Sequence, residues 1–159
     1  MTSPLQRSAD IITRAAGWKE ALPDDDGVFR FSLEGGLDFE LLSPENRTGI
    51  LLAVLGSAPE NDGRSDETLQ RLAQLSAGSL KKRRSTFSIG ERGLELYRTF
   101  SLSEASEQSL PRTVRDFLND LAWWKQQLSG TGNARPSGAQ SSPFSFAFGD
   151  WFSSGNFQG

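Results

Sequence analysis

Residues 27–42, GVFRFSLEGGLDFELL, predict two short strands joined by a tight turn. Hydrophobic and polar residues alternate over 28–33 and again over 37–42, and this period of two is typical of strands with one buried face. The glycines at 35–36 can adopt the backbone angles that a hairpin turn requires. The stretch therefore predicts an antiparallel hairpin.

Three further strand patterns extend this hairpin into a sheet. Residues 49–55, GILLAVL, are apolar on both sides, which is typical of a strand in the middle of a sheet. A second hairpin follows later, in which 87–89 and 94–100 flank the turn residues 90–93. The sequence thus predicts a three-stranded meander and a separate hairpin.

Helical patterns precede, interrupt and follow these strands. Ser3 can cap a first helix, Gln6 completes a capping box, and Pro23 is expected to end it. A second helix is expected over 65–80, with Ser65 as its N-cap. A third starts near Pro111, and its apolar residues recur at a spacing of four and three as far as Leu128.

The predicted order is α-β-β-β-α-β-β-α, which is an α+β fold with a small twisted antiparallel sheet flanked by helices. The domain is expected to cover residues 1–128, and 129–159 form a C-terminal tail rich in Gly, Ser and Phe. Such a sheet usually leaves hydrophobic faces that a single copy cannot cover. We therefore expect an interaction module that forms a homodimer.

Composition limits the possible functions. The chain has 159 residues and a formal net charge of −3, which argues against binding nucleic acid or an anionic membrane. It contains no Cys and no His, so disulfides, thiolate zinc sites and imidazole chemistry are excluded. No apolar run is long enough to cross a bilayer, and the polar N-terminus lacks a signal-peptide core. We expect a cytoplasmic protein without membrane insertion.

Catalysis is the competing interpretation. Without His or Cys, an enzyme would have to use carboxylates, Lys or Ser. Glu34, Asp38, Glu40 and Glu45 cluster around the first hairpin, but strand alternation sends Asp38 and Glu40 to the solvent face. Solubility explains these carboxylates better, so we expect no enzymatic activity, no cofactor and no metal ion.

Six segments together resemble a known family: GVFRFSL, LDFELL, GILLAVLG, DETLQRLAQLSAGSL, STFSIGERGLELYRTFSL and VRDFLNDLAWWKQQL. Their order, with the size and acidity of the chain, resembles the class I chaperones of bacterial type III secretion systems. Those chaperones are small cytosolic homodimers that hold the N-terminal region of a secreted effector. The likeness covers roughly residues 3–128 and is one of architecture.

The resemblance implies a set of partners and contact residues. A secreted effector would be the client, and the ATPase of the export apparatus a further partner. The client-binding candidates are Ile12, Val28, Phe29, Phe31, Phe39 and Leu41. The dimer-interface candidates are Leu69, Leu72, Leu75, Phe87 and Ile89. The alternative function is an adaptor or regulator of the same fold that binds a folded partner of the secretion apparatus.

Two segments leave alternatives open. The basic run 81–84 is interpreted as a solvated helix end, with contact to an acidic partner as the alternative. The tail is either a disordered segment or a built-in substitute for the client, because its aromatic residues alternate like those of a strand. The candidate self-occluding residues are Phe144, Phe146, Phe148, Trp151 and Phe152.

Overall fold

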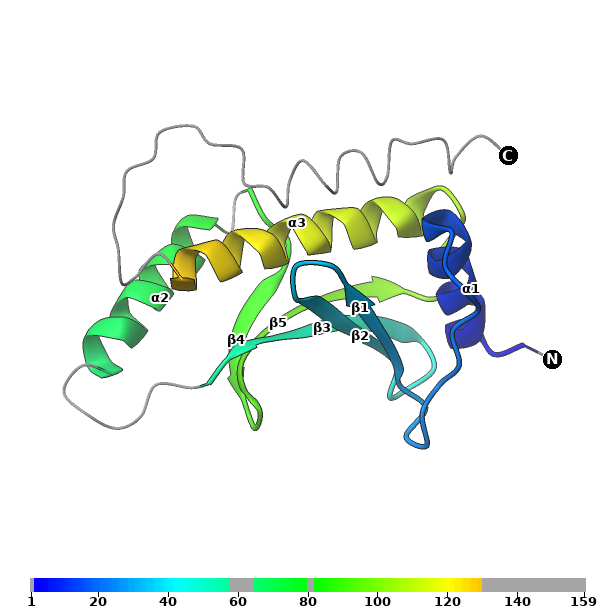
Figure 1. The fold of residues 1–159 in the computed structure, drawn as a ribbon, viewed down its shortest axis with the longest axis horizontal. Coiled ribbons are helices and arrows are strands. Elements are labelled where there is room, and N and C mark those ends of the chain that lie inside the picture. Colours follow the sequence, from blue (N-terminus) through cyan, green and yellow to red (C-terminus); the bar gives the residue numbers. More distant parts are fainter. Residues whose placement is uncertain (1, 58–64, 80–81, 130–159) are drawn as a thin grey trace.

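The computed structural model describes residues 2–57, 65–79 and 82–129. It confirms the predicted α+β order (Figure 1). In chain order the elements are α1 (Pro4–Ala16), β1 (Phe29–Leu33), β2 (Leu37–Leu42), β3 (Thr48–Gly56), α2 (Ser65–Ser79), β4 (Thr86–Gly90), β5 (Gly93–Ser101) and α3 (Ser109–Ser129).

The five strands form one sheet in the order β1-β2-β3-β5-β4, with every neighbouring pair antiparallel. β3 lies in the middle, as its two-sided apolar pattern predicts. It pairs with β2 through Leu41↔Leu51 and with β5 through Ala53↔Leu96. The second hairpin therefore joins the meander through β5, which leaves β1 and β4 as the edge strands of the described sheet.

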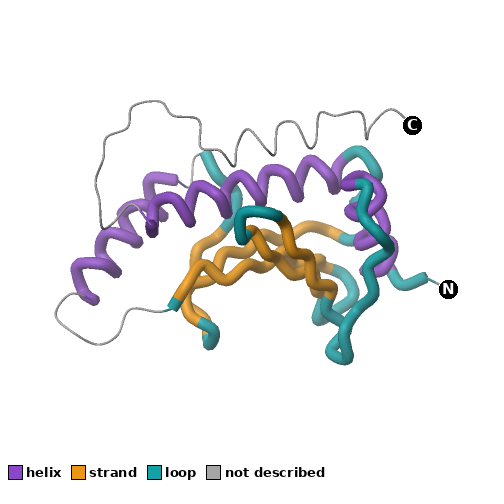
Figure 2. The backbone as a smooth tube through the Cα atoms, viewed as in Figure 1, coloured by secondary structure: helices purple, strands orange, loops and turns teal. Residues whose placement is uncertain are grey.

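The helices occupy one side and the two ends of the sheet. α3 runs along one face, α1 lies near its N-terminal end, and α2 projects at the opposite end of the molecule (Figures 1 and 2). Below, we call the side without α3 the open face, because no described helix lies over it. The fold thus has two layers, with the core between α3 and the sheet.

The inward seam of α3 makes the centre of this core. Leu110, Val114, Phe117, Leu121 and Trp124 are all buried. The Phe117 ring meets Phe39 of β2 edge-on, with centroids 6.1 Å apart. The sequence predicted that this seam packs on the sheet or on another chain, and the structure shows the sheet.

The first helix is shorter than predicted. The Ser3 hydroxyl accepts a hydrogen bond from the Gln6 backbone N–H at 3.1 Å, which confirms the N-cap. The helix ends at Ala16, however, where Gly17 adopts a left-handed φ of 69° and caps the last carbonyls. Trp18 therefore lies outside the helix, and its ring stacks on Phe31 at 5.7 Å.

The basic run differs from its interpretation as a solvated helix end. α2 ends at Ser79, and Arg83 donates a hydrogen bond to Asp120 of α3. The guanidinium of Arg83 also lies 4.5 Å from the centroid of the Trp123 ring. At least this member of the run is therefore a packing residue between the α2–β4 connection and α3.

Candidate functional site

The structure buries most of the predicted client-binding residues. Ile12, Phe29, Phe31, Phe39 and Leu41 are at most 5% exposed, and only Val28 is half-buried. Their interpretation as surface residues is wrong, because strand alternation points the four strand residues into the core, and Ile12 lies on the buried side of α1. Phe31 is held between Trp18 and Phe39, whose ring centroids lie 5.7 and 4.9 Å from its own.

The side chains between these buried positions form the open face instead. Its members alternate with core residues along each strand: Arg30, Ser32, Asp38, Glu40, Leu42, Ile50, Leu52, Val54, Glu95, Tyr97 and Thr99. Ile50, Leu52 and Tyr97 are half-buried, and Val54 is 37% exposed. These four residues form an apolar centre that no described helix covers.

The sequence of β3 contains a pattern that predicts this apolar surface. The odd positions of β3 supply the core, yet the even positions Ile50, Leu52 and Val54 are apolar too. In an ordinary sheet with one solvated face, those even positions would be polar. The two-sided pattern was interpreted only as evidence for a central strand, whereas it also marks an apolar outer face.

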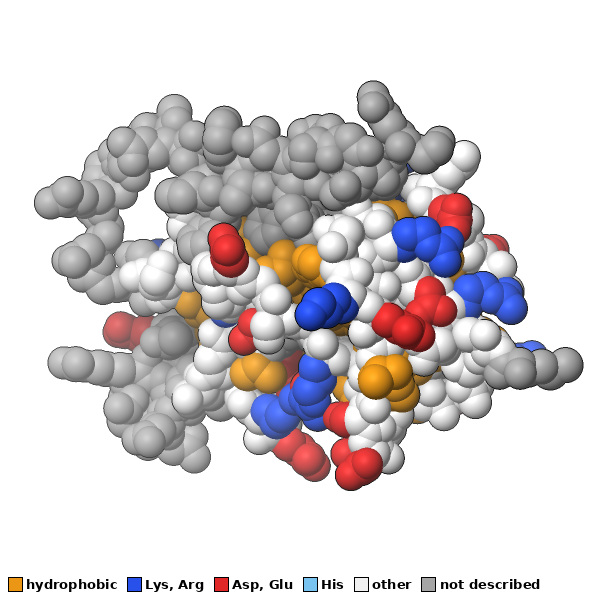
Figure 3. All heavy atoms as spheres, turned by 45° about the vertical axis from the view of Figure 1, so that its right-hand side comes forward, with side chains coloured by type: hydrophobic (Ala, Val, Ile, Leu, Met, Phe, Trp, Pro, Cys, Tyr) orange, Lys and Arg blue, Asp and Glu red, His pale blue; other side chains and the backbone are white. Residues whose placement is uncertain are grey.

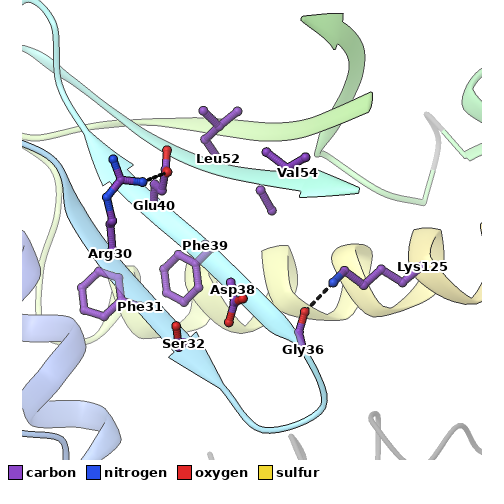
Figure 4. A pocket seen from close by; sticks show the side chains of 11 residues that line it. Arg30, Phe31, Ser32, Gly36, Asp38, Phe39, Glu40, Leu52, Val54 and Lys125 are labelled. Carbon is purple, nitrogen blue, oxygen red and sulfur yellow. Dashed lines mark hydrogen bonds and ion pairs between the residues drawn. The ribbon is translucent and has the colours of Figure 1, made fainter. Parts of the chain in front are cut away.

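A pocket of about 310 Å³ lies over β1, β2 and β3. Figure 4 shows Leu52 and Val54 on its β3 side, with Arg30 and Glu40 on the neighbouring strands. Gly36 of the β1–β2 turn and Lys125 of α3 also line it. Lys125 donates a hydrogen bond to the Gly36 carbonyl, so the pocket reaches the place where α3 approaches the first hairpin.

Three charged side chains near this pocket, Arg30, Glu40 and Arg92, form a network of ion pairs. Glu40 of β2 accepts hydrogen bonds from Arg92, at 2.9 and 3.0 Å, and from Arg30. Arg92 belongs to the β4–β5 turn, so its ion pair reaches across β3. Arg30 also contacts Asp24 at 3.0 Å. On the side of the molecule in Figure 3, hydrophobic patches likewise lie among acidic and basic side chains.

This network shifts the ionisation of its members. The hydrogen bond from Arg92 is the main cause that holds the pKa of Glu40 below its ordinary value of 4.5. The same hydrogen bond raises the pKa of Arg92. The pKa of Asp24 is lowered, chiefly by the Val28 backbone N–H. Glu40, Asp24 and Arg92 are thereby held in their charged forms and form a polar border beside the apolar centre.

The predicted dimer residues fall into two environments. Leu72 of α2 is 2% exposed, and Leu69 and Leu75 are half-buried. Phe87 of β4 stacks on Trp124 of α3 at 4.8 Å, so part of this set serves the core of the chain itself. Ile89 is different, because 54% of it is exposed on the edge strand β4.

The remaining sequence predictions concern the tail, metal ions and membrane spans. The self-occlusion candidates Phe144 to Phe152 belong to 130–159, which the structure does not describe. In 2–57, 65–79 and 82–129, no group of three acidic side chains is placed to hold a metal ion. Within the same residues, no helix is long and apolar enough to cross a membrane.

Comparison with solved structures places this arrangement among known folds. A chain in the HopA1–SchA chaperone–effector complex aligns with a TM-score of 0.61 and 16% identity, over 79% of this chain and 95% of that one. A chain in the ExsC–ExsE complex aligns with a TM-score of 0.62 and 16% identity, over 80% and 96%. A third is the Yersinia pestis type III secretion chaperone SycH in complex with a fragment of YscM2, at a TM-score of 0.49 and 10% identity, over 74% and 98%.

The chain has a fold like that of the type III secretion chaperones. Neither a protein-family model nor a curated protein sequence matches the chain. At 16% identity, the likeness to the SchA and ExsC complexes concerns the path of the backbone rather than individual side chains. The chaperone fold here is therefore specified by hydrophobic pattern and element order.

Proposed function

We propose that this protein is a non-catalytic chaperone for a type III secreted effector. It binds the N-terminal segment of that effector, keeps it soluble and secretion-competent, and aids its delivery to the export apparatus. The observation that carries this proposal is the open face, whose apolar centre of Ile50, Leu52, Val54 and Tyr97 is covered by no described helix. The naming of one aligned structure as a chaperone–effector complex supports it further.

The geometry suits an extended, unfolded segment. Apolar side chains of such a segment can enter the pocket over β1 to β3, while its backbone pairs with an edge strand such as β1. The carboxylate of Glu40 is already paired with Arg30 and Arg92, so apolar residues can cover it without leaving this charge unpaired. Binding of this kind needs no chemical step.

We further propose a homodimer in the bacterial cytoplasm, with the export-apparatus ATPase as a later partner. The exposed Ile89 and the edge of β4 support a contact between two copies. α2 projects from the rest of the fold with Leu69 and Leu75 only half-buried, which supports the same contact. Dimerisation would then use the end of the sheet opposite β1.

Capture from the native cell tests the function. Tagged full-length protein is expected to retain one large partner through its N-terminal segment, as shown by mass determination and limited proteolysis. A Val54→Asp variant should lose that partner, because the bound segment would bury an unpaired carboxylate, at a cost of about 2 kcal/mol or more in binding free energy. Leu22→Asp is the matched control, since Leu22 is 78% exposed and lies in the α1–β1 connection, off the open face.

Two results would contradict the proposal. One is a folded apparatus component retained in place of an unfolded segment, which would favour the adaptor function. The other is equal capture by the Val54→Asp and wild-type proteins, with both folded by circular dichroism, because the open face would then not be the binding surface.

A further inference from the structure

The end of α3 lies beside the pocket of the open face. Lys125 lines that pocket and donates a hydrogen bond to the Gly36 carbonyl in the β1–β2 turn. Ser129, the last residue of α3, is four residues farther on, about 6 Å along a helix axis. The chain that continues from Ser129 therefore starts about one helical turn beyond a residue that lines the pocket.

The length of that chain is sufficient to reach any part of the face. Residues 130–143 contain only Gly, Ser, Thr, Ala, Gln, Asn, Arg and Pro. A random coil of this length would have an r.m.s. span of about 20 Å, and a fully extended chain would span roughly 46 to 50 Å. The nine residues of β3 extend over about 30 Å.

The segment that follows has the chemistry of an extended apolar ligand. Residues 144–152, FSFAFGDWF, place Phe144, Phe146 and Phe148 at alternate positions, so all three share one side in an extended conformation. Asp150 is the only charged residue among them. Such a segment matches a surface whose centre is apolar and where Glu40 is already paired with Arg30 and Arg92.

We propose that residues 144–152 of this chain dock in extended form on the open face, with the alternate phenylalanines over Leu52 and Val54. The tail thereby shields the apolar centre in the absence of a client. Its role as a competitor of the client rests on the function proposed above, whereas the docking itself does not. Because the tail is covalently attached, its effective concentration at the open face is high. A longer client segment can still displace it.

Disulfide trapping tests the docking directly, because the chain contains no native cysteine. The full-length Val54→Cys/Phe146→Cys variant is treated with diamide, and the products are separated on a non-reducing denaturing gel and mapped by mass spectrometry. Docking predicts a rapid intrachain disulfide, since the two Cα atoms must come within about 7 Å.

The matched control is Leu22→Cys/Phe146→Cys. Leu22 is more exposed than Val54, 78% against 37%, so random collision would favour the control pair. We expect cross-linking of the Val54 pair to be at least about tenfold faster, which corresponds to a preference of about 1.4 kcal/mol. Equal rates for both pairs would overturn the proposal, and so would a covalent dimer, because the tail of a second copy would then occupy the face.

A second measurement keeps all six aromatic residues of the tail intact. A nitroxide attached at Ser153→Cys should broaden the amide resonances of 50–54 more than those of 17–22, and uniform broadening would contradict docking.

A third measurement tests competition with the client. If the tail covers the face about nine-tenths of the time, replacing Phe144, Phe146 and Phe148 by Ser should raise client affinity about tenfold. The cross-linking experiment contains no client, so a negative result would not contradict the proposed chaperone function. A failure of client capture would likewise not contradict the docking of the tail.

Discussion

Arg83 Nη1 lies 3.0 Å from Asp120 Oδ1, and this ion pair fastens the segment after α2 to the side of α3. Asp120 is only 5% exposed and also accepts hydrogen bonds from the backbone N–H and the hydroxyl of Ser85, at 3.3 and 2.5 Å. β4 begins directly after Ser85, so the cluster sets where the edge strand enters the sheet.

Replacement of Asp120 by Ala should therefore destabilise the fold by about 2 to 3 kcal/mol, because Ser85 and Arg83 would lose their partner in a largely buried site. Chemical denaturation measures this loss. Asp116→Ala is the control on the same helix, where the carboxylate is 48% exposed and 4.0 Å from Arg98, and it should cost less than about 1 kcal/mol. Equal decreases in the free energy of unfolding for the two variants would contradict a stabilising role of the Asp120 cluster.

Phe31→Asp should unfold the protein instead of weakening client capture selectively. The ring is 5% exposed and stacks between Trp18 and Phe39, so a carboxylate there would be buried without a partner. Loss of the thermal transition by circular dichroism is the expected result. Ser32→Asp, one residue away on the open face, should remain folded. A folded Phe31→Asp protein would restore Phe31 as a surface candidate.

Gly49→Ala should destabilise β3. A Cβ atom at this position would lie 2.6 Å from Cε1 of the Phe100 ring, which fills the space above the strand. Displacing an aromatic ring in a packed region costs about 1 to 3 kcal/mol. Gly56→Ala, on the same strand, has no heavy atom within 4 Å of its added Cβ and should leave stability nearly unchanged. The two midpoints of urea denaturation distinguish these cases.

Glu40→Gln should remove a pH-dependent part of the stability. The pKa of Glu40 is lowered in the folded protein, so its contribution is present above its ordinary value of 4.5 and is lost as the pH falls through the lower folded value. The difference in free energy of unfolding between wild type and variant should be at most about 1 kcal/mol near pH 7, since the pairs are partly solvated. It should shrink below pH 4.5.

A double-mutant cycle with Arg92→Met supplies the control for Glu40. The hydrogen bond from Arg92 is the largest cause of the lowered pKa, so the effect of Glu40→Gln should be smaller in the Arg92→Met background. An unchanged effect there would assign the pH dependence to Arg30 or to solvent exposure.

Ile89→Arg should weaken the proposed homodimer about tenfold or more, because the exposed apolar side chain on edge strand β4 would be replaced by a charge at the contact. Light scattering should show twice the 17.4 kDa chain mass for wild type and a shift toward the monomer for the variant. Leu22→Arg, at a more exposed apolar site, should keep the wild-type mass. A dimer that tolerates Ile89→Arg would contradict this interface.

Much of the fold was predictable because its determinants are local. The alternation in 28–33 and 37–42 specifies strands, and the hydroxyl of Ser3 caps a helix three residues ahead of Gln6. The sequence predicts a first helix that extends too far along the chain. Gly17 adopts the left-handed conformation and ends the helix, although the apolar pattern continues toward Pro23. Local capping outweighed hydrophobic periodicity at that point.

The candidate site was less predictable. Alternation tells which residues share a face, so Phe31 and Phe39 belong together and Arg30 and Glu40 lie opposite them. It does not tell which of two apolar faces a helix will cover, and β3 has two such faces. The pattern alone therefore predicts the wrong face for Phe31 and Phe39 and does not single out Leu52 and Val54.

The sequence alone determined the element order, the hairpin turns, the central place of β3 and the absence of Cys and His chemistry, because each depends on neighbouring residues or on composition. Only the tertiary structure decided that α3 buries the Phe31 and Phe39 side of the sheet, that Asp120 holds Arg83 across 37 positions, and that Arg92 reaches Glu40 across β3. Contacts between residues so far apart in the chain depend on how whole elements pack, and that packing is a property of the assembled core.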